Sequence, residues 1–432
     1  MKAKSLTYEE RLAGLMQQSG IERLDSHHQQ FIQQQALAFR FTQQELRQLC
    51  DIATDLTMWG EAGLNEVWPE IDSEKLAPKQ RRQRLLQQLR NHWLQLKEQP
   101  NSYPALPLAP AHDTQRIKRT HTEKTKLALG LCPVASPRTR CCNLMTLDAV
   151  ENCGFDCSYC SIQSFYHGDE VRFDSRFGEK LAQLEIDPDR FYHIGTGQSS
   201  DSLMWGNQAG ILDALLDFAR SHPNVMLELK TKSKNISHLL KTDCPPNLLC
   251  TWSLNTPTLI ANEEHLTATL DERLRAARRL ADRGVLVGFH FHPMIHYQGW
   301  RADYAALFQR LVDEFTADEV VLVSLGTLTY IKPVIKQLRT RKGFHSKILQ
   351  MPMVESDGKL SYPQAIKQEM FSFAYQSLRA WHDKVFFYLC MENHHLWQPV
   401  FGYEYPSNLA FEEAMKQAYL SKIRNIGDRG ER

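Results

Sequence analysis

Apolar positions in the first hundred residues recur with the period of an α-helix. Three such patterns are present, at about residues 32–39, 42–56 and 79–97, and the second opens with the residue order of a capping box. The proline-containing stretch 101–110 has no period, which is typical of a boundary. We therefore predict an N-terminal helical domain over residues 1–110.

The pattern changes from residue 145 onward, where short apolar runs alternate with helical patterns. The runs predict strands at 145–150, 191–196, 225–231, 249–254, 285–292 and 319–325. The other patterns predict helices near 173–185, 207–221, 235–241, 271–283, 301–315 and 331–340. Such alternation is typical of parallel βα units with right-handed crossovers. We predict an α/β fold with a partial (βα)6 barrel over residues 111–345, with its reactive groups at the C-terminal ends of the strands.

The remaining residues mix both kinds of pattern. An aromatic helix is predicted around residues 370–381, and a strand over 384–390. We interpret 346–432 as a C-terminal mixed α/β cap, whose strand either closes the barrel or covers its mouth.

Charge and composition narrow the class of protein. The chain has 432 residues, with 51 Lys and Arg against 50 Asp and Glu, and this balance argues against a general nucleic-acid coat. The N-terminus has no apolar core after its lysines, and no stretch approaches the roughly 18–20 apolar residues of a membrane span. We expect a cytoplasmic protein without a membrane partner, in which the ten cysteines are thiols or ligands.

One cysteine-rich segment, Cys153-Gly-Phe-Asp-Cys157-Ser-Tyr-Cys160, directly follows the first predicted strand. Three soft thiolates on one tight loop are suited to an iron–sulfur cluster, and three ligands on a four-iron cluster leave one iron open to a small molecule. The alternatives are buried thiols or a zinc site. Zinc needs a fourth ligand, and only His167 lies nearby.

The other seven cysteines give weaker indications of a metal site. Cys141 and Cys142 stand side by side and could be extra ligands, but adjacent side chains usually point apart, so we favour ordinary thiols. The remaining five are scattered, and we expect them to be small buried hydrophobic residues: Cys50, Cys132, Cys244, Cys250 and Cys390.

Histidines and basic residues also form groups. His290 and His292 share one face of the fifth predicted strand, with His296 close behind, and we favour polar lining of the barrel mouth over a metal site. Basic clusters occur at residues 79–84, 116–126 and 339–347. They are either solvated faces or parts of one phosphate-binding rim.

The spacing Cys-x3-Cys-x2-Cys after the first strand of a partial βα barrel resembles the radical S-adenosylmethionine (radical SAM) superfamily. A narrower resemblance, over about residues 140–330, is to the spore photoproduct lyase family of DNA-repair enzymes. The stretches that carry it are Gly197-Gln-Ser-Ser-Asp-Ser202, Leu229-Lys-Thr-Lys-Ser233, Trp252-Ser-Leu-Asn-Thr256, Leu270-Asp-Glu-Arg-Leu274, Gly288-Phe-His-Phe-His-Pro-Met-Ile-His-Tyr-Gln-Gly-Trp300 and Ser324-Leu-Gly-Thr-Leu-Thr-Tyr330.

The resemblance implies a lyase-like enzyme that binds a four-iron, four-sulfur (4Fe-4S) cluster and cleaves S-adenosyl-L-methionine to a 5′-deoxyadenosyl radical. It implies DNA or another nucleic acid as a partner, and a reductant protein such as flavodoxin or ferredoxin. The residues matching the cluster ligands are Cys153, Cys157 and Cys160; those matching cofactor contacts are Ser200, Asp201, Lys232 and Ser253; and those at catalytic positions are Tyr159 and Gln198.

Two positions depart from the family. Gln198 stands where a cysteine returns a hydrogen atom to the product radical, and Ser161 stands where a tyrosine follows the third cluster cysteine. Cys250, on a predicted barrel strand, is a candidate replacement donor. A radical SAM enzyme acting on a protein, RNA or small molecule therefore stays open, as does a non-catalytic, metal-stabilised nucleic-acid-binding protein.

Overall fold

The structure is a computed structural model that describes residues 6–71, 76–104, 117–132, 138–166, 170–197, 199–356 and 358–430. Its contacts divide the chain into two compact units. The helical unit comprises Met1–His112 and Tyr330–Leu360, and the sheet unit comprises Asp113–Thr329 and Ser361–Arg432. The domain boundaries expected near residues 110 and 345 stay predictions.

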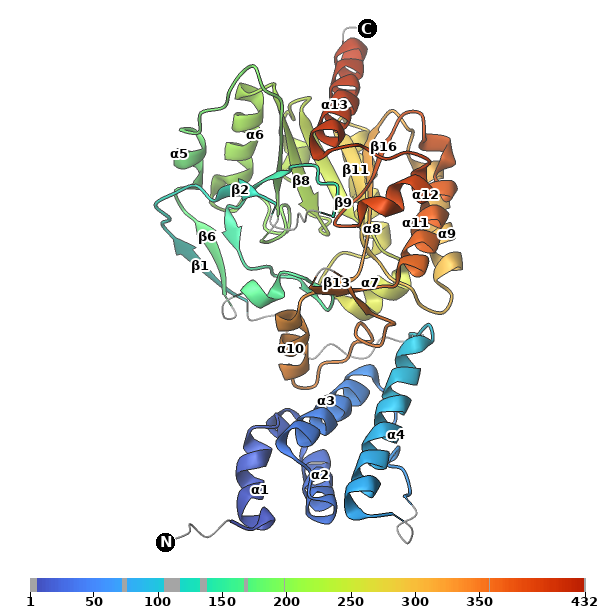
Figure 1. Cartoon of the computed structure of the whole chain (residues 1–432). Coiled ribbons are helices and arrows are strands. Elements are labelled where there is room, and N and C mark those ends of the chain that lie inside the picture. The colour runs from blue at the N-terminus through green and yellow to red at the C-terminus, as the bar shows by residue number, and fades with distance from the viewer. Residues whose placement is uncertain are drawn as a thin grey trace. The chain divides into compact units, whose positions relative to one another are not determined.

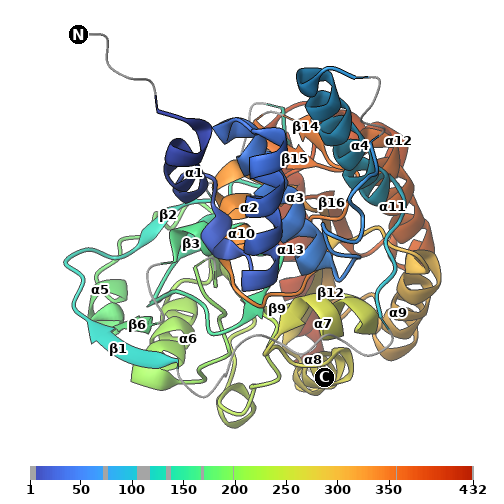
Figure 2. The same cartoon turned by 90° about the horizontal axis from the view of Figure 1, so that it is seen from below.

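The helical unit is built around one central helix. Helix α3 (Gln43–Trp59) contacts α1 (Tyr8–Gln17), α2 (Ser26–Phe39), α4 (Pro78–Glu98) and α10 (Lys332–Thr340) (Figure 2). Its predicted capping box is confirmed, because the Thr42 hydroxyl accepts from the Glu45 amide at 3.3 Å and the Glu45 carboxylate accepts from the Thr42 amide at 2.7 Å. The core of this unit includes Leu46, Leu49, Ile52, Leu56, Leu85 and Leu89.

Helix α10 belongs to the helical unit through a buried ion pair. The Arg339 guanidinium donates from Nε and Nη2 to the two oxygens of Asp55, at 2.8 and 2.7 Å. The Trp93 indole donates to the same carboxylate at 3.0 Å. Asp55 is fully buried, so its charge depends on these donors.

Replacing Arg339 with alanine is expected to lower the free energy of unfolding of the helical unit by about 3–5 kcal/mol, because it leaves the Asp55 carboxylate buried without its cation. Urea denaturation followed by tryptophan fluorescence measures this loss. The control is Lys336→Ala, at an exposed position of the same helix, which should change little. Equal effects of the two substitutions would contradict the importance of the pair.

The sheet unit contains one curled sheet of eight strands, flanked by helices (Figure 1). The spatial order of the eight strands is β16 (Phe386–Leu389), β12 (Val320–Thr327), β11 (Leu286–Met294), β9 (Leu248–Ser253), β8 (Val225–Thr231), β7 (Tyr192–Thr196), β3 (Met145–Leu147) and β2 (Leu129–Leu131). All neighbours are parallel except β2 and β3. The predicted α/β class is confirmed, and the strand over 384–390 extends the sheet as β16. The division into six βα units stays a prediction.

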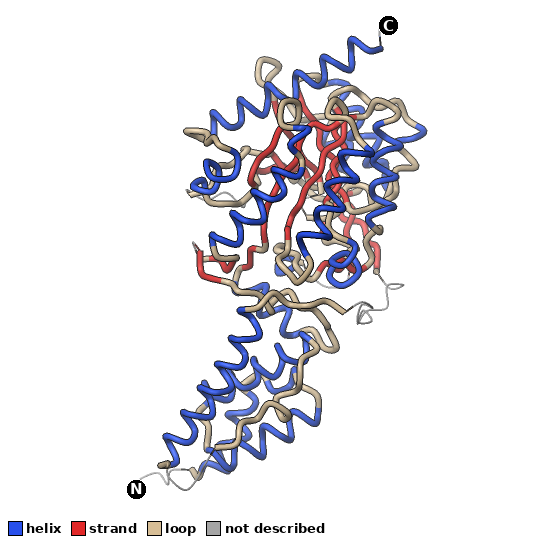
Figure 3. Tube along the Cα trace, turned by 90° about the vertical axis from the view of Figure 1, so that its right-hand side faces the viewer, coloured by secondary structure: helices blue, strands red, loops and turns tan. Residues whose placement is uncertain are grey.

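The helices of this unit lie outside the sheet. They are α5 (Phe177–Leu181), α6 (Ile211–Ser221), α7 (Pro257–Glu263), α8 (Leu270–Ala281), α9 (Trp300–Glu314), α11 (Gln364–Ser377), α12 (Trp397–Phe401) and α13 (Asn408–Gly430). Figure 3 shows the strands in red between the blue helices. The inward faces of the strands are therefore left to line an interior. Among the described residues, no helix combines the length and the apolar character needed to cross a bilayer.

Three predicted elements differ from the structure. The helix expected near 173–185 is limited to α5, because residues 170–174 form a strand. The strand expected over 145–150 is broken: β3 lies in the large sheet, whereas β4 (Val150–Glu151) joins β1 (Lys118–Thr122) and β6 (Glu170–Asp174) in a small one. The helix expected over 235–241 is one 3-10 turn at Leu239–Lys241. The Ser233 hydroxyl accepts from the Asn235 amide at 3.0 Å, and such local side-chain bonds compete with helix formation.

Two further small sheets complete the structure. Strand β5 (Asp156–Cys157) pairs with β10 (Glu264–His265) in antiparallel orientation. The other sheet has the order β13 (Thr329–Tyr330), β15 (Lys359–Ser361) and β14 (Val354–Ser356).

Candidate metal and cofactor site

The three cysteines of the predicted cluster motif line one cavity of about 250 Å³ in the sheet unit. Their loop is a tight turn, in which the Cys160 amide donates to the Cys157 carbonyl at 3.1 Å. The Phe155 amide donates to the Cys153 sulfur at 3.4 Å. The Phe155 N–H favours the thiolate form of Cys153, whereas burial raises the pKa of Cys153 to about 12 and also raises the pKa of Cys157, so both side chains are thiols until a metal displaces their protons.

The spacing of these sulfur atoms separates the two kinds of metal site. In the described part of the chain, the sulfurs of Cys153, Cys157 and Cys160 do not all lie within 4.8 Å of one another. A single tetrahedral zinc ion, with Zn–S bonds of about 2.3 Å, would bring them to roughly 3.8 Å. A four-iron cluster binds each cysteine through a different iron and needs wider spacing. Among the described residues, these three sulfurs therefore do not form the close set that one tetrahedral zinc ion needs.

The loop is held by the short strand pair β5–β10. Cys157 lies opposite Glu264, and Asp156 lies opposite His265. The Ser158 amide continues the pairing by donating to the Glu263 carbonyl at 2.9 Å. Backbone hydrogen bonds thus fix the central cysteine against the segment between α7 and α8.

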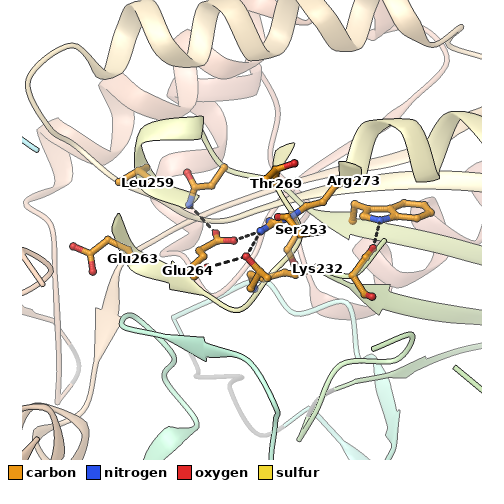
Figure 4. Close-up of polar contacts among 12 residues, drawn as sticks. Lys232, Ser253, Leu259, Glu263, Glu264, Thr269 and Arg273 are labelled. Carbon is orange, nitrogen blue, oxygen red and sulfur yellow. Dashed lines mark hydrogen bonds and ion pairs between the residues drawn. The ribbon is translucent and has the colours of Figure 1, made fainter. Parts of the chain in front are cut away.

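A buried ion pair supports this segment from behind. The Arg273 Nη2 donates to Glu264 Oε2 at 2.5 Å, and both side chains are almost completely buried (Figure 4). Arg273 also donates to the backbone carbonyls of Ala268 and Ser253, each at 2.8 Å. The hydroxyl of Tyr159 donates to Glu264 Oε1. One carboxylate therefore joins the cysteine loop to helix α8 and the end of β9.

The residues predicted to contact the cofactor, Ser200, Asp201, Lys232 and Ser253, line the same cavity as the cysteines. The Ser200 hydroxyl is buried and has no hydrogen-bond partner in the described structure. An unsatisfied hydroxyl facing a cavity is suited to a polar ligand. Their roles as cofactor contacts stay predictions.

Asp201 is occupied by the protein itself. Its Oδ1 accepts from the Leu203 and Met204 amides at 3.0 and 2.9 Å and from the Thr231 hydroxyl at 2.7 Å. Its Oδ2 accepts from the Lys232 amide at 2.6 Å. Asp201 therefore shapes the loop after β7 and joins it to the end of β8.

Lys232 brings positive charge to the cysteine loop. Its ammonium lies 5.6 Å from the centroid of the Tyr159 ring. Burial alone would lower the pKa of Lys232, but the neighbouring Cys157 thiol and Glu264 carboxylate raise it above its ordinary value. The ammonium form is therefore retained at neutral pH, next to the position where thiolates would collect negative charge.

The two predicted catalytic residues differ in what the structure describes. Tyr159 is buried and lines the cavity, with its hydroxyl directed at Glu264. Gln198 lies outside the described residues, as does His167. Ser161 lines the cavity. Cys250 is buried and is not among the cavity-lining residues, so its position does not favour the hydrogen-donor role.

We expected the three histidines His290, His292 and His296 to line the barrel mouth as polar side chains, and the contacts of the first two agree with this. His290 and His292 line the cavity, and His296 does not. His290 Nε2 lies 2.6 Å from Glu228 Oε1, and His292 Nε2 lies 2.7 Å from the Ser324 hydroxyl. Burial and the nearby Lys230 lower the pKa of His290 to about 4. The His290 imidazole is therefore neutral at pH 7.

Sequence reasoning missed several charged residues that shape the site, although each had a signal. Arg273 lies three residues after Leu270 and four before Ala277, on the apolar face of α8, where a charge requires a buried partner. Glu228 and Lys230 lie two residues apart on β8, Lys232 directly follows the end of this strand, and all three line the cavity. Glu264 had no such local signal.

Comparisons with known proteins point to one family. Residues 152–353 match the spore photoproduct lyase family. A spore photoproduct lyase of Clostridium acetobutylicum is 26% identical over 184 residues, which cover 40% of this chain and 53% of that protein. The Bacillus subtilis spore photoproduct lyase is 33% identical over 85 residues, covering 20% and 25% of the two chains. The chain thus matches about half of the length of the Clostridium relative.

The fold agrees with the sequence comparison. A solved spore photoproduct lyase complexed with dinucleoside spore photoproduct superposes with a TM-score of 0.54 at 19% identity, over 63% of this chain and 82% of that one. A variant with bound AdoMet and dinucleoside spore photoproduct gives a TM-score of 0.51 at 18% identity, over the same shares. Residues 152–353 are therefore similar to the spore photoproduct lyase family, and the chain shares the fold of the solved spore photoproduct lyases.

Proposed function

We propose that this protein is a radical SAM enzyme that holds a 4Fe-4S cluster on Cys153, Cys157 and Cys160 and binds S-adenosyl-L-methionine in the adjoining cavity. The observation that carries this proposal is the joint lining of one cavity by three separated thiols, the unpartnered Ser200 hydroxyl and the Lys232 ammonium. When bound, the cluster supplies the electron for reductive cleavage of the cofactor to a 5′-deoxyadenosyl radical.

The protein's own residues would bind the cluster and would orient and enclose the cofactor. The cysteines supply anionic sulfur, and Lys232 offsets part of that charge. Ser200 and Ser253 offer hydroxyl groups to the polar end of the cofactor. The pair Glu264–Arg273 holds the loop in place through β10 and Tyr159. A preorganised ligand set of this kind avoids reorganisation when the cluster is reduced.

For the substrate, we propose a nucleic-acid lesion and a lyase-like reaction. The spore photoproduct lyase relatives support this choice, including the solved complex with dinucleoside spore photoproduct. Only part of the predicted basic clusters is free to bind phosphates of such a substrate. Arg82, Arg339 and Lys347 are already in ion pairs with acidic side chains. The electron would come from a reductant protein such as flavodoxin or ferredoxin.

The substrate is tested separately from the radical chemistry. The anaerobically reconstituted protein is incubated with dithionite, S-adenosyl-L-methionine and dinucleoside spore photoproduct, and thymine dinucleoside and 5′-deoxyadenosine are quantified by mass spectrometry. Recovery of thymine dinucleoside supports lesion repair. Formation of 5′-deoxyadenosine without it would reject spore photoproduct as the substrate and favour the alternative suggested by Gln198, a radical SAM enzyme for a protein, RNA or small molecule.

A further inference from the structure

A cavity of about 700 Å³ lies in the helical unit, and the proposed function does not use it. Its lining residues come from helices α3, α4 and α10, from the turn after α1, and from the segment 349–360 that follows α10. Ligand pockets in proteins have volumes of roughly 300–1,000 Å³. We call it the helical-unit cavity, and its size suits a small organic ligand or one part of a larger one.

Positive charge is in excess around the helical-unit cavity. Among the described residues that line it, three are acidic, and the six basic ones are Arg23, Arg47, Lys97, Lys332, Lys336 and Arg339. The whole chain is almost neutral, with 51 basic against 50 acidic residues, so the excess is local. A concave surface with one sign of charge concentrates ions of the opposite sign.

Two of the six cations are neutralised by the protein itself. Arg23 Nη2 lies 2.8 Å from Asp51 Oδ1. Arg339 pairs with both Asp51 and Asp55, at 3.4 and 2.7 Å. These pairs use two of the three acidic side chains, and the third, Glu22, is exposed. The cavity therefore keeps an excess of cations after its own ion pairs are formed.

The other four cations form no ion pair in the part of the chain that the structure describes. They are Arg47 on α3, Lys97 on α4, and Lys332 and Lys336 on α10. The Arg47 guanidinium donates to the Gln18 carbonyl at 3.4 Å. None of the four lies in the basic clusters predicted from the sequence. Those clusters group neighbours along the chain, whereas these four residues come from three separate helices.

Lys97 is half-buried beside the cavity. Its ammonium lies 4.3 Å from the centroid of the Trp93 ring and forms no hydrogen bond with a described residue. Burial lowers the pKa of Lys97, whereas Asp55 opposes this shift and Arg339 adds to it. A partly desolvated ammonium next to another cation is costly unless an anion compensates it. An anion in the cavity would provide that compensation.

Apolar side chains line the same cavity beside these cations, and they include Ile335, Leu349, Met353 and Leu360. Lys and Arg bind phosphate groups, and apolar surface favours the organic part of a ligand. We propose that the helical-unit cavity binds the phosphate groups of a nucleotide, either free or within a nucleic-acid strand. Both sources present the same phosphate ester to the cations. This site is independent of the cofactor site at the Cys153 loop.

The test measures the binding of two probes to the full-length protein. ATP is titrated by isothermal titration calorimetry, and a short fluorescein-labelled oligothymidylate is titrated by fluorescence anisotropy. The cavity variant, with Lys97→Gln, Lys332→Gln and Lys336→Gln together, should weaken binding of the probe by about tenfold or more. For oligothymidylate, the slope of log K against log salt should also become shallower by up to about 2, because each phosphate contact on a single strand contributes about 0.7.

The matched control removes three other cations of the same unit. Lys79, Arg84 and Arg90 are exposed on α4 and do not line the cavity. Their joint replacement with glutamine should leave both affinities within about twofold of the wild-type values. A second cavity variant, Lys332→Gln with Lys336→Gln, changes only exposed positions and should still weaken binding. Circular dichroism checks that every variant keeps its fold.

The two probes distinguish the sources of the phosphate. Binding of oligothymidylate that ATP does not displace identifies a nucleic-acid strand, and binding of ATP alone identifies a free nucleotide. The proposal is overturned if neither probe binds with a dissociation constant below about 1 mM, or if the cavity variants bind as well as the wild-type or control protein. These outcomes are independent of the proposed function, which fails instead if the wild-type chain forms no 5′-deoxyadenosine.

Discussion

Replacing Cys157 with alanine is expected to abolish S-adenosyl-L-methionine cleavage, down to the background of protein without a cluster. Cys157 is the central thiol of the loop and the residue that β10 holds in place. A 4Fe-4S cluster that keeps only two of its three cysteine ligands is not retained in the form that offers one open iron. The measurements are iron per chain and 5′-deoxyadenosine formed per chain under reducing conditions.

Iron per chain should fall toward the background together with cleavage, because Cys157 supplies one of the three proposed cluster ligands. Cys244→Ala is the matched control, because Cys244 does not line the cavity, and it should leave both readouts unchanged. Cleavage that persists in Cys157→Ala would refute the ligand assignment at this residue.

The second large effect is expected at Arg273. Replacing it with methionine leaves the Glu264 carboxylate buried without its cation and should lower the free energy of unfolding of the sheet unit by about 3–5 kcal/mol. Cluster loading should also fall, because Glu264 lies opposite Cys157 and accepts from Tyr159. Denaturant unfolding of the protein before reconstitution measures the first effect, and iron per chain after reconstitution measures the second.

A matched control lies on the same helix. Arg278 pairs with Glu319 and Asp282 near the surface, so Arg278→Met should cost no more than about 1 kcal/mol. Combining Arg273→Met with Glu264→Leu should recover part of the lost stability, because no unpaired charge remains. If Arg273→Met were no more harmful than Arg278→Met, the buried pair would not be what supports the loop.

The repeating part of the fold was predictable from local pattern. Strands β8, β9, β11 and β12 are buried along most or all of their length, and their apolar runs gave positions within two residues of those observed. For short strands, the pattern of apolar residues did not predict where the strand ends. Strand β3 has three residues, and the chain leaves the large sheet at Asp148, although the apolar run continues to Val150. A change of sheet depends on pairing with distant residues, which periodicity does not report.

The site shows the same limit. The three cysteines of the loop were identifiable because their spacing is local. The pair Glu264–Arg273 depends on packing between β5, β10 and α8. Its only signal in the sequence was the charged Arg273 on the apolar face of α8. Thr139 and Asn393 form a bridge between segments some 250 residues apart, and no spacing rule in the sequence connects such residues.

The central claim is that the Cys153 loop and the cavity beside it carry out reductive cleavage of S-adenosyl-L-methionine. The most direct measurement is 5′-deoxyadenosine by mass spectrometry, after the reconstituted wild-type protein is incubated anaerobically with dithionite and the cofactor and without any substrate. We predict 5′-deoxyadenosine and methionine in equal amounts, and none from the variant lacking Cys153, Cys157 and Cys160. A wild-type protein that binds iron and sulfide at this loop and yet forms no 5′-deoxyadenosine would contradict the account.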